Sequence, residues 1–209
     1  MTIKSTIYDL LVSRRYDAEL ETVTEDARRR CVDMLAPRPG ATALDLGCGT
    51  GLNLPHLVRA VGTGGRVIAL DASRRMLDQA AARLEREGIA DRVTLLHGDA
   101  RRVDELVAAE LDGAPLDALL ITLFMSVVPA WREVYARAFS LLGPGGRCAM
   151  MDTYWPKPPF RLWLMSWSYA ADPKRPGFEL LRETCDDFVL EQFPPDIEHG
   201  FYLASGTKR

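Results

Sequence analysis

The sequence has few of the residues that bind metals or form disulfides. It contains four cysteines and three histidines in 209 residues, with no C-x-x-C pair and no histidine cluster at metal-ligand spacing. We therefore expect reduced thiols and no metal site. Cys48 lies in a glycine-rich turn, where a small residue packed beneath a ligand is a simpler interpretation than a nucleophile.

Long hydrophobic runs and runs of basic residues are also absent. The first residues have no apolar signal core, and no apolar stretch approaches the roughly 20 residues that cross a bilayer. The net charge of -3 gives no long-range attraction to a polyanion. These absences predict a cytoplasmic protein whose main substrate is not nucleic acid.

The composition fits one compact domain over residues 1–209. Apolar residues make up 47% of the chain and charged residues 26%, which is enough for one core but not for a second large domain. The sequence has no internal repeat or low-complexity segment.

The most informative segment is 41–51, an apolar strand followed by glycines at alternate positions. Gly47, Gly49 and Gly51 allow a sharp turn and a close approach of backbone to ligand. A second apolar strand ends at Asp71, where such folds hold a ribose. Together these features predict an adenosine-containing ligand.

A dinucleotide is the less suitable adenosine ligand. The dinucleotide fingerprint G-x-G-x-x-G requires a glycine at the position of Leu52. Asp45 lies two residues before the first glycine and would repel phosphates, whereas it suits a ligand with a cationic amino-acid end.

The segment 44–54, Leu-Asp-Leu-Gly-Cys-Gly-Thr-Gly-Leu-Asn-Leu, resembles the first motif of the class I S-adenosylmethionine (SAM) methyltransferases. Three more features resemble that superfamily in the same order: Asp71 as the ribose acid, the pair Asp99-Ala100 at the adenine, and the turn 142–146 before the fifth strand. The resemblance implies SAM as cofactor. The cofactor-binding residues expected from it are Asp45, Gly47, Cys48, Gly49, Gly51, Asp71, Ala72, Met76, Asp99, Ala100 and Thr122.

The predicted fold is a doubly wound α/β domain, with a seven-stranded, mostly parallel sheet and a C-terminal antiparallel hairpin. Hydrophobic periodicity predicts two helices in 4–36, followed by strands alternating with helices. The strands are expected near 41–46, 66–71, 93–99, 116–122 and 146–152, the helices near 53–61, 73–87, 101–110 and 130–142, and the hairpin strands at 188–193 and 201–205. Within the single domain we expect a helical lid (1–36), a SAM-binding core (37–152), an aromatic acceptor-side insert (153–178) and a terminal hairpin (188–206).

The acceptor side has no decisive catalytic signature. Tyr8, Tyr16 and Tyr154 are the candidates for a catalytic role, with Thr122, Ser126 and Asp152 as further polar groups near the same edge. Apolar and aromatic residues dominate there: Phe124, Met125, Val127, Val128, Trp155, Phe160, Leu162, Trp163, Leu164, Met165, Trp167 and Tyr169. An apolar or amphipathic acceptor is therefore expected.

Tyr8-Asp, Tyr16-Asp and the short aromatic insert resemble the bacterial phosphatidylethanolamine N-methyltransferases and quinone-biosynthesis methyltransferases. This resemblance favours methyl transfer to an amine of a lipid-like molecule. A natural-product tailoring methyltransferase and a SAM-binding module without methyl transfer remain open alternatives. The insert is expected to cap an acceptor pocket, with peripheral membrane contact as the alternative.

Overall fold

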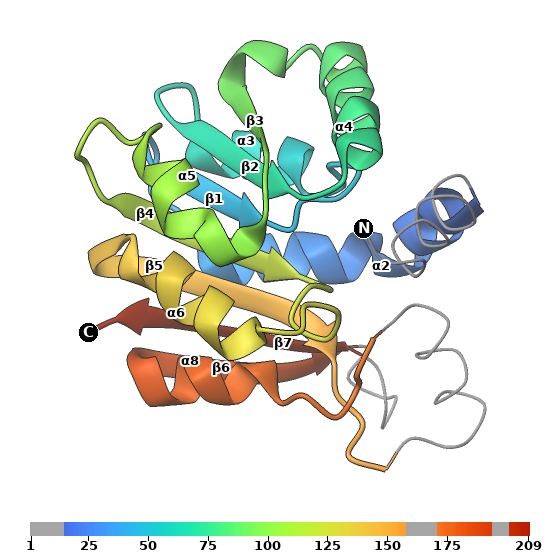
Figure 1. The fold of residues 1–209 in the computed structure, drawn as a ribbon, viewed down its shortest axis with the longest axis vertical. Helices are drawn as coiled ribbons and strands as arrows, with labels where there is room; N and C mark the ends of the chain where they lie inside the picture. Colours follow the sequence, from blue (N-terminus) through green and yellow to red (C-terminus); the bar gives the residue numbers. More distant parts are fainter. Residues whose placement is uncertain (1–14, 158–170, 194–200) are drawn as a thin grey trace.

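The computed structural model describes residues 15–157, 171–193 and 201–209, with side chains from residue 24 onward in the first range. Its centre is a seven-stranded sheet in the order β3-β2-β1-β4-β5-β7-β6 (Figure 1). The strands are β1 (Thr42–Leu46), β2 (Arg66–Asp71), β3 (Val93–His97), β4 (Leu116–Thr122), β5 (Leu142–Thr153), β6 (Cys185–Phe193) and β7 (Phe201–Lys208). The helices are α2 (Arg15–Leu35), α3 (Leu54–Val61), α4 (Arg74–Glu87), α5 (Val103–Ala108), α6 (Trp131–Ser140) and α8 (Gly177–Thr184).

The predicted fold class is confirmed. Strands β1 to β5 pair in parallel, and β7 runs antiparallel to both of its neighbours, β5 and β6. β4 lies at the middle of the sheet, and its apolar side chains alternate between the two faces: Leu119 and Ile121 face one core, Ala118 and Leu120 the other. This explains why the strand is almost entirely apolar.

Several predicted boundaries were wrong. β5 begins at Leu142, not 146, because Leu142 pairs with Leu116 before a register shift. The helix expected at 101–110 is divided into a 3-10 turn at 100–102 and α5. α8 was not among the predicted helices. The first described helix is continuous from residue 15 to 35, and the segment before it lies outside the described residues.

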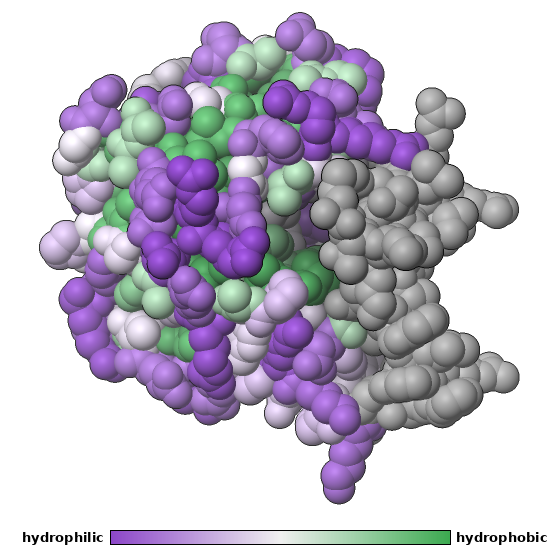
Figure 2. All heavy atoms as spheres, viewed as in Figure 1, coloured by the Kyte–Doolittle hydropathy of each residue, from purple (hydrophilic) through white to green (hydrophobic). Residues whose placement is uncertain are grey.

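Two layers of helices cover the sheet. α5, α6 and α8 pack on the face seen in Figure 1, and α2, α3 and α4 contribute to the core on the other face. Hydrophilic side chains cover much of the outer surface of the first layer, with apolar side chains in the gaps between them (Figure 2). Within the described part of the chain, no helix has the length and hydropathy needed to cross a bilayer.

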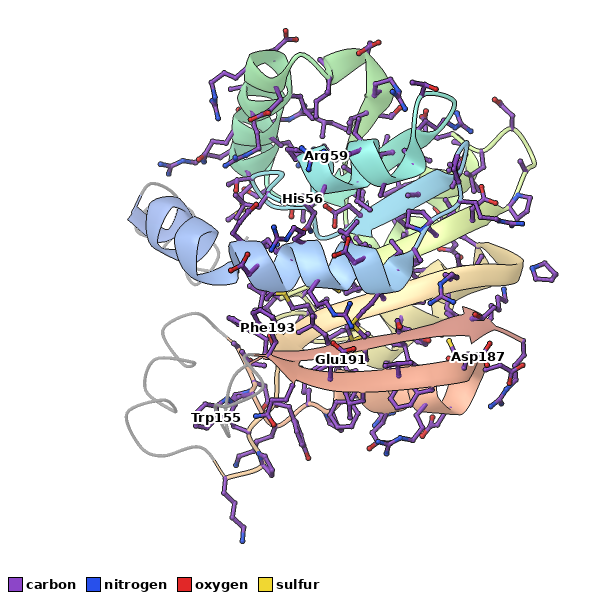
Figure 3. All side chains as sticks on the ribbon, turned by 180° about the vertical axis from the view of Figure 1, so that it is seen from behind. His56, Arg59, Trp155, Asp187, Glu191 and Phe193 are labelled. Atoms are coloured by element: carbon purple, nitrogen blue, oxygen red, sulfur yellow. The ribbon has the colours of Figure 1, made fainter. Side chains whose placement is uncertain are left out.

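α2 crosses the second face of the sheet (Figure 3). Ala27, Cys31, Met34 and Leu35 have the spacing of one face of an amphipathic helix, and all four are buried. The helix ends at Leu35, two residues before Pro37. Arg147 of β5 caps this end: its Nε donates to the Leu35 carbonyl at 2.8 Å and its Nη2 to the Met34 carbonyl at 2.9 Å. The position of α2 on the sheet therefore depends partly on β5.

Arg147→Met should lower the free energy of unfolding by about 1 to 3 kcal/mol, because two charge-assisted hydrogen bonds to helix carbonyls are lost. Urea denaturation followed by circular dichroism measures this change. Arg66→Met is the matched control, since Arg66 is exposed and makes only a 3.4 Å side-chain contact with Thr42. An equal effect of the two substitutions would contradict the capping role.

Candidate functional site

The glycine-rich turn lies where β1 ends, at the carboxyl edge of the parallel strands. Gly47, Gly49 and Gly51 have φ angles of 73°, 56° and 79°, which favour glycine over residues with a side chain. The amides of Gly47 and Cys48 donate to the Leu70 carbonyl at 2.9 and 3.1 Å, which fixes the turn beside β2. The predicted turn is therefore present and tied to the neighbouring strand.

The three glycines meet different surroundings. A Cβ on Gly47 would lie 2.2 Å from the Phe124 ring, and one on Gly51 would lie 2.9 Å from Leu54. A Cβ on Gly49 would have only the Met76 sulfur nearby, at 3.6 Å. Gly51 therefore serves helix packing, whereas Gly47 allows the loop after β4 to approach the turn.

Asp71, the last residue of β2, is hydrogen-bonded to the turn. Its Oδ2 accepts from the Gly49 amide at 2.9 Å, and its Oδ1 accepts from the Ser73 amide at 2.8 Å. Ala72 is exposed and Met76 is buried on the first turn of α4. The structure thus brings together the glycines and the acid that the sequence predicted as neighbours.

Asp99 follows β3 and begins the turn that contains the buried Ala100. The Asp99 carboxylate is exposed and accepts from Nε of Arg101 at 2.9 Å. This bond to the Arg101 side chain lowers the pKa of Asp99. The His97 ring is also exposed, with Nε2 lying 3.1 Å from the Ala72 carbonyl. The ends of β2 and β3 are therefore adjacent at this edge.

Asp45 lies beneath the turn and is 0% exposed. Both of its carboxylate oxygens accept from Asn53 Nδ2 at 3.1 Å, and the same nitrogen lies 2.9 Å from Thr122 Oγ1. Arg28 of α2 donates through Nη1 to Asn53 Oδ1 at 2.9 Å and to Thr122 Oγ1 at 3.0 Å. We call Arg28, Asp45, Asn53 and Thr122 the buried polar cluster.

Burial raises the pKa of Asp45 to about 7, against the lowering effects of the Asn53 hydrogen bond and of the Arg28 charge. Burial also raises the pKa of the Cys48 thiol well above its ordinary value. A thiol held neutral is a poor nucleophile, which agrees with a packing role for Cys48.

Sequence reasoning missed Arg28 and Asn53. Asn53 falls within the glycine motif, but nothing in the sequence indicates that its amide faces Asp45. Arg28 is one of three consecutive arginines, and only the helical phase of α2 turns it inward: Arg29 pairs with Asp26 at 3.0 Å and Arg30 with Glu191 at 2.5 Å, both partly exposed. The presence of a cation in the cluster was therefore unexpected.

The loop after β4 forms the neighbouring side of this edge. Leu123 has a φ of 51°, an uncommon conformation for a branched residue that is often found at functional sites. It directs the chain so that the half-buried Phe124 ring lies against Gly47. Asp152 holds the same loop, because its Oδ2 accepts from the Ser126 amide at 2.9 Å and its Oδ1 from the Thr153 amide at 2.8 Å.

Aromatic side chains continue this edge. Tyr154 contacts Phe178 edge-on, with ring centroids 5.3 Å apart. Trp155 donates its backbone amide to the Pro173 carbonyl at 2.7 Å, and Phe193 and Phe201 pair at the same end of β6 and β7. Figure 3 shows Trp155 and Phe193 toward one end of the molecule. The hairpin that pairs these two residues was predicted, but its position beside β5 was not, because the sequence does not show which strand the hairpin joins.

Some of the predicted site residues fall outside the described part of the chain. These are Tyr8, the Tyr16 side chain, and the insert residues Phe160, Leu162, Trp163, Leu164, Met165, Trp167 and Tyr169. Among the residues that are described, no cluster of side chains could hold a metal ion.

The buried Asp45 predicts a pH dependence of stability. Its pKa is raised from 3.8 to about 7 on folding, so the folded state loses stability, relative to the unfolded chain, as the pH rises through that interval. Asp45→Asn cannot ionise, and its stability relative to wild type should rise between about pH 5 and pH 8 by up to a few kcal/mol, at about 1.4 kcal/mol per unit of pKa shift.

Urea denaturation at both pH values measures the difference. Asp78→Asn removes the same charge from an exposed position on α4 and is the control. A stability difference between wild type and Asp45→Asn that does not change with pH would contradict the prediction.

Comparison with known proteins agrees with this geometry. Residues 43–146 match a family model described as a methyltransferase domain. The chain is 31% identical over 150 residues to a nocamycin O-methyltransferase of Saccharothrix syringae, covering 72% of this chain and 51% of the relative. It is 31% identical over 132 residues to a demethylmenaquinone methyltransferase of Lactococcus lactis, covering 63% and 50%. The chain thus spans about half the length of these curated relatives.

Among solved structures, a geranyl diphosphate methyltransferase in complex with SAM superposes with a TM-score of 0.68 at 16% identity, covering 92% of this chain and 88% of that one. At this identity the likeness concerns the fold alone. The family match and the fold agree with the ordered motifs at the strand ends. The chain therefore belongs to the methyltransferase-domain family whose model it matches over residues 43–146.

Proposed function

We propose that this chain is a SAM-dependent methyltransferase that acts on a small apolar or amphipathic acceptor. The observation that carries the proposal is the turn with Gly47, Gly49 and Gly51 at positive φ, hydrogen-bonded through Gly49 to Asp71. This arrangement places an open backbone and a carboxylate at the carboxyl edge of a parallel sheet, where ligands of such folds bind.

The residues at this edge fit the parts of SAM. The open space at Gly49 suits the methionine portion, and Asp71 has acceptor oxygens for the ribose hydroxyls. Asp99 and the Ala100 amide follow the next strand and suit the adenine. Asp45, which is buried beneath the turn, supplies negative charge toward the ammonium group without being exposed. Cys48, Ala72, Met76 and Thr122 complete the proposed surroundings.

SAM supplies a methyl group that its sulfonium already activates, so the chain has mainly to orient an acceptor and exclude water. Phe124 and Trp155 bring apolar surface to the neighbouring edge. Asp152 is not proposed as a base, because its carboxylate is buried and its oxygens hold the backbone of the loop after β4 and of Thr153. An amine acceptor that arrives unprotonated would need no base from the protein.

The acceptor class is inferred from this apolar edge. An amine of a lipid-like molecule is our first proposal, and a natural product is the alternative, to which the name of the nocamycin relative corresponds. The name of the second relative gives demethylmenaquinone as the acceptor of that protein. We further propose that the segment 1–36 contributes a lid and that 153–178 caps the acceptor pocket.

Asp71→Ala should weaken SAM binding at least about tenfold, since hydrogen bonds between its carboxylate and the ribose hydroxyls, each worth about 1.5 to 3 kcal/mol, are lost. Titration calorimetry gives the dissociation constant. Asp78→Ala, which removes an exposed carboxylate from α4, is the control. Unchanged affinity in Asp71→Ala would exclude the ribose assignment.

A second experiment tests methyl transfer. The protein is incubated with methyl-labelled SAM and a cell extract, and the label is then followed into organic-soluble and aqueous fractions. We expect label in organic-soluble or amphipathic products, and a several-fold lower rate in Trp155→Ala with unchanged SAM affinity. Label in a polar natural product would favour the alternative acceptor. SAM binding without any transferred label would indicate a binding module.

A further inference from the structure

Arg28 connects the N-terminal helix to the proposed cofactor site. It lies outside the range 43–146 that matches the methyltransferase family, and it is only 7% exposed. Its Nε donates to Thr24 Oγ1 at 2.9 Å on the same helix. Its Nη1 donates to Asn53, just after the glycine turn, and to Thr122, at the end of β4. One guanidinium therefore joins three separate parts of the chain.

We propose that Arg28 is a positioning residue for cofactor binding: by orienting the Asn53 amide toward Asp45 and holding the end of β4, it fixes the glycine turn in the shape that receives SAM. The inference rests on the function proposed above. Asp45 and Asn53 are the two residues that bracket the turn, and the Asn53 amide joins them. Because Arg28 occupies Asn53 Oδ1, the amide nitrogen has to face the carboxylate.

The charge of Arg28 has a second effect at the same place. The charged groups that act on Asp45 are Arg28 from α2 and Asp71 from β2, while Cys31 and Cys48 have raised pKa values and stay neutral. Arg28 lowers the pKa of Asp45 and Asp71 raises it. Removing the guanidinium would let Asp45 take up a proton at higher pH, and the attraction toward a cationic ligand would then be lost.

The neighbouring arginine provides a matched control. Arg29 follows Arg28 on the same helix, is 64% exposed at its side chain, and contacts Asp26 rather than the cluster. Arg29→Gln removes the same charge from the same helix without touching the site. A difference between the two variants therefore reports the hydrogen bonds and the location of Arg28, and not the net charge of the protein.

The experiment is titration calorimetry of SAM binding from about pH 6 to pH 9, at a temperature where circular dichroism shows each variant folded. Arg28→Gln should bind SAM about tenfold more weakly than wild type near neutral pH, or about 1.4 kcal/mol. The affinity for SAM should fall as the pH is lowered and Asp45 takes up a proton. The midpoint of this fall should lie at a higher pH in Arg28→Gln than in wild type. Arg28→Lys should recover part of the affinity because it restores the charge, and Arg29→Gln should match wild type.

Thr24→Val is a second variant that keeps the charge of Arg28 and removes the hydroxyl that accepts from its Nε. It should weaken SAM binding by a smaller factor than Arg28→Gln, without moving the pH midpoint. If Arg28→Gln does not fold, the SAM affinity of Thr24→Val tests the proposal instead. Wild-type affinity and midpoint in folded Arg28→Gln, or wild-type affinity in Thr24→Val where Arg28→Gln is unfolded, would overturn the proposal. Failure of the wild-type protein to bind SAM would instead overturn the proposed function.

Discussion

The buried carboxylate of Asp45 is the constraint on which the organisation of the site depends. An ionised carboxylate without water is costly, and it persists only when hydrogen-bond donors and an opposite charge surround it. Asn53 supplies the donor and Arg28 the charge, with Thr122 hydrogen-bonded to both. These groups come from α2, the turn after β1 and the end of β4. Stabilising one carboxylate thus requires the helix and two strand ends to be correctly placed together.

Burial of the Asp45 carboxylate also lowers the stability of the folded protein. Burial raises the pKa of Asp45 to about 7, so the ionised form lowers the stability of the folded protein at neutral pH. Buried ionic groups can often be replaced by hydrophobic residues of similar volume without loss of stability. The carboxylate is instead kept directly beneath backbone torsions that only glycine readily adopts, at Gly47 and Gly49. Buried charge is typical of functional sites, and here it lies at the proposed cofactor position.

The sequence predicted those parts of the site that are local in the chain. The glycine turn and Asp71 are adjacent because consecutive parallel strands place their carboxyl ends together, and this follows from the alternation of strands and helices. Arg28 was not predicted, since its partners Asn53 and Thr122 are 25 and 94 residues away and the contact depends on the rotation of α2. The positions of Phe193 and Phe201 were not predicted for the same reason, because they depend on the strand order β5-β7-β6. The long-range partners of a helix face and the order of distant strands are tertiary properties that periodicity does not encode.

The two sides of the proposed site, at the carboxyl edge of the sheet, come from different parts of the chain. The turn, Asp71 and Asp99 all lie within residues 43–146, the part shared with a broad methyltransferase family. Trp155, Tyr154 and the strands β6 and β7 lie beyond it, and so does Arg28 on the other side. One fold can serve many functions, and the residues added to the shared core then decide between them. What distinguishes this chain from its relatives should therefore lie in α2 and in the segments after β5, and not in the glycine turn that identifies the family.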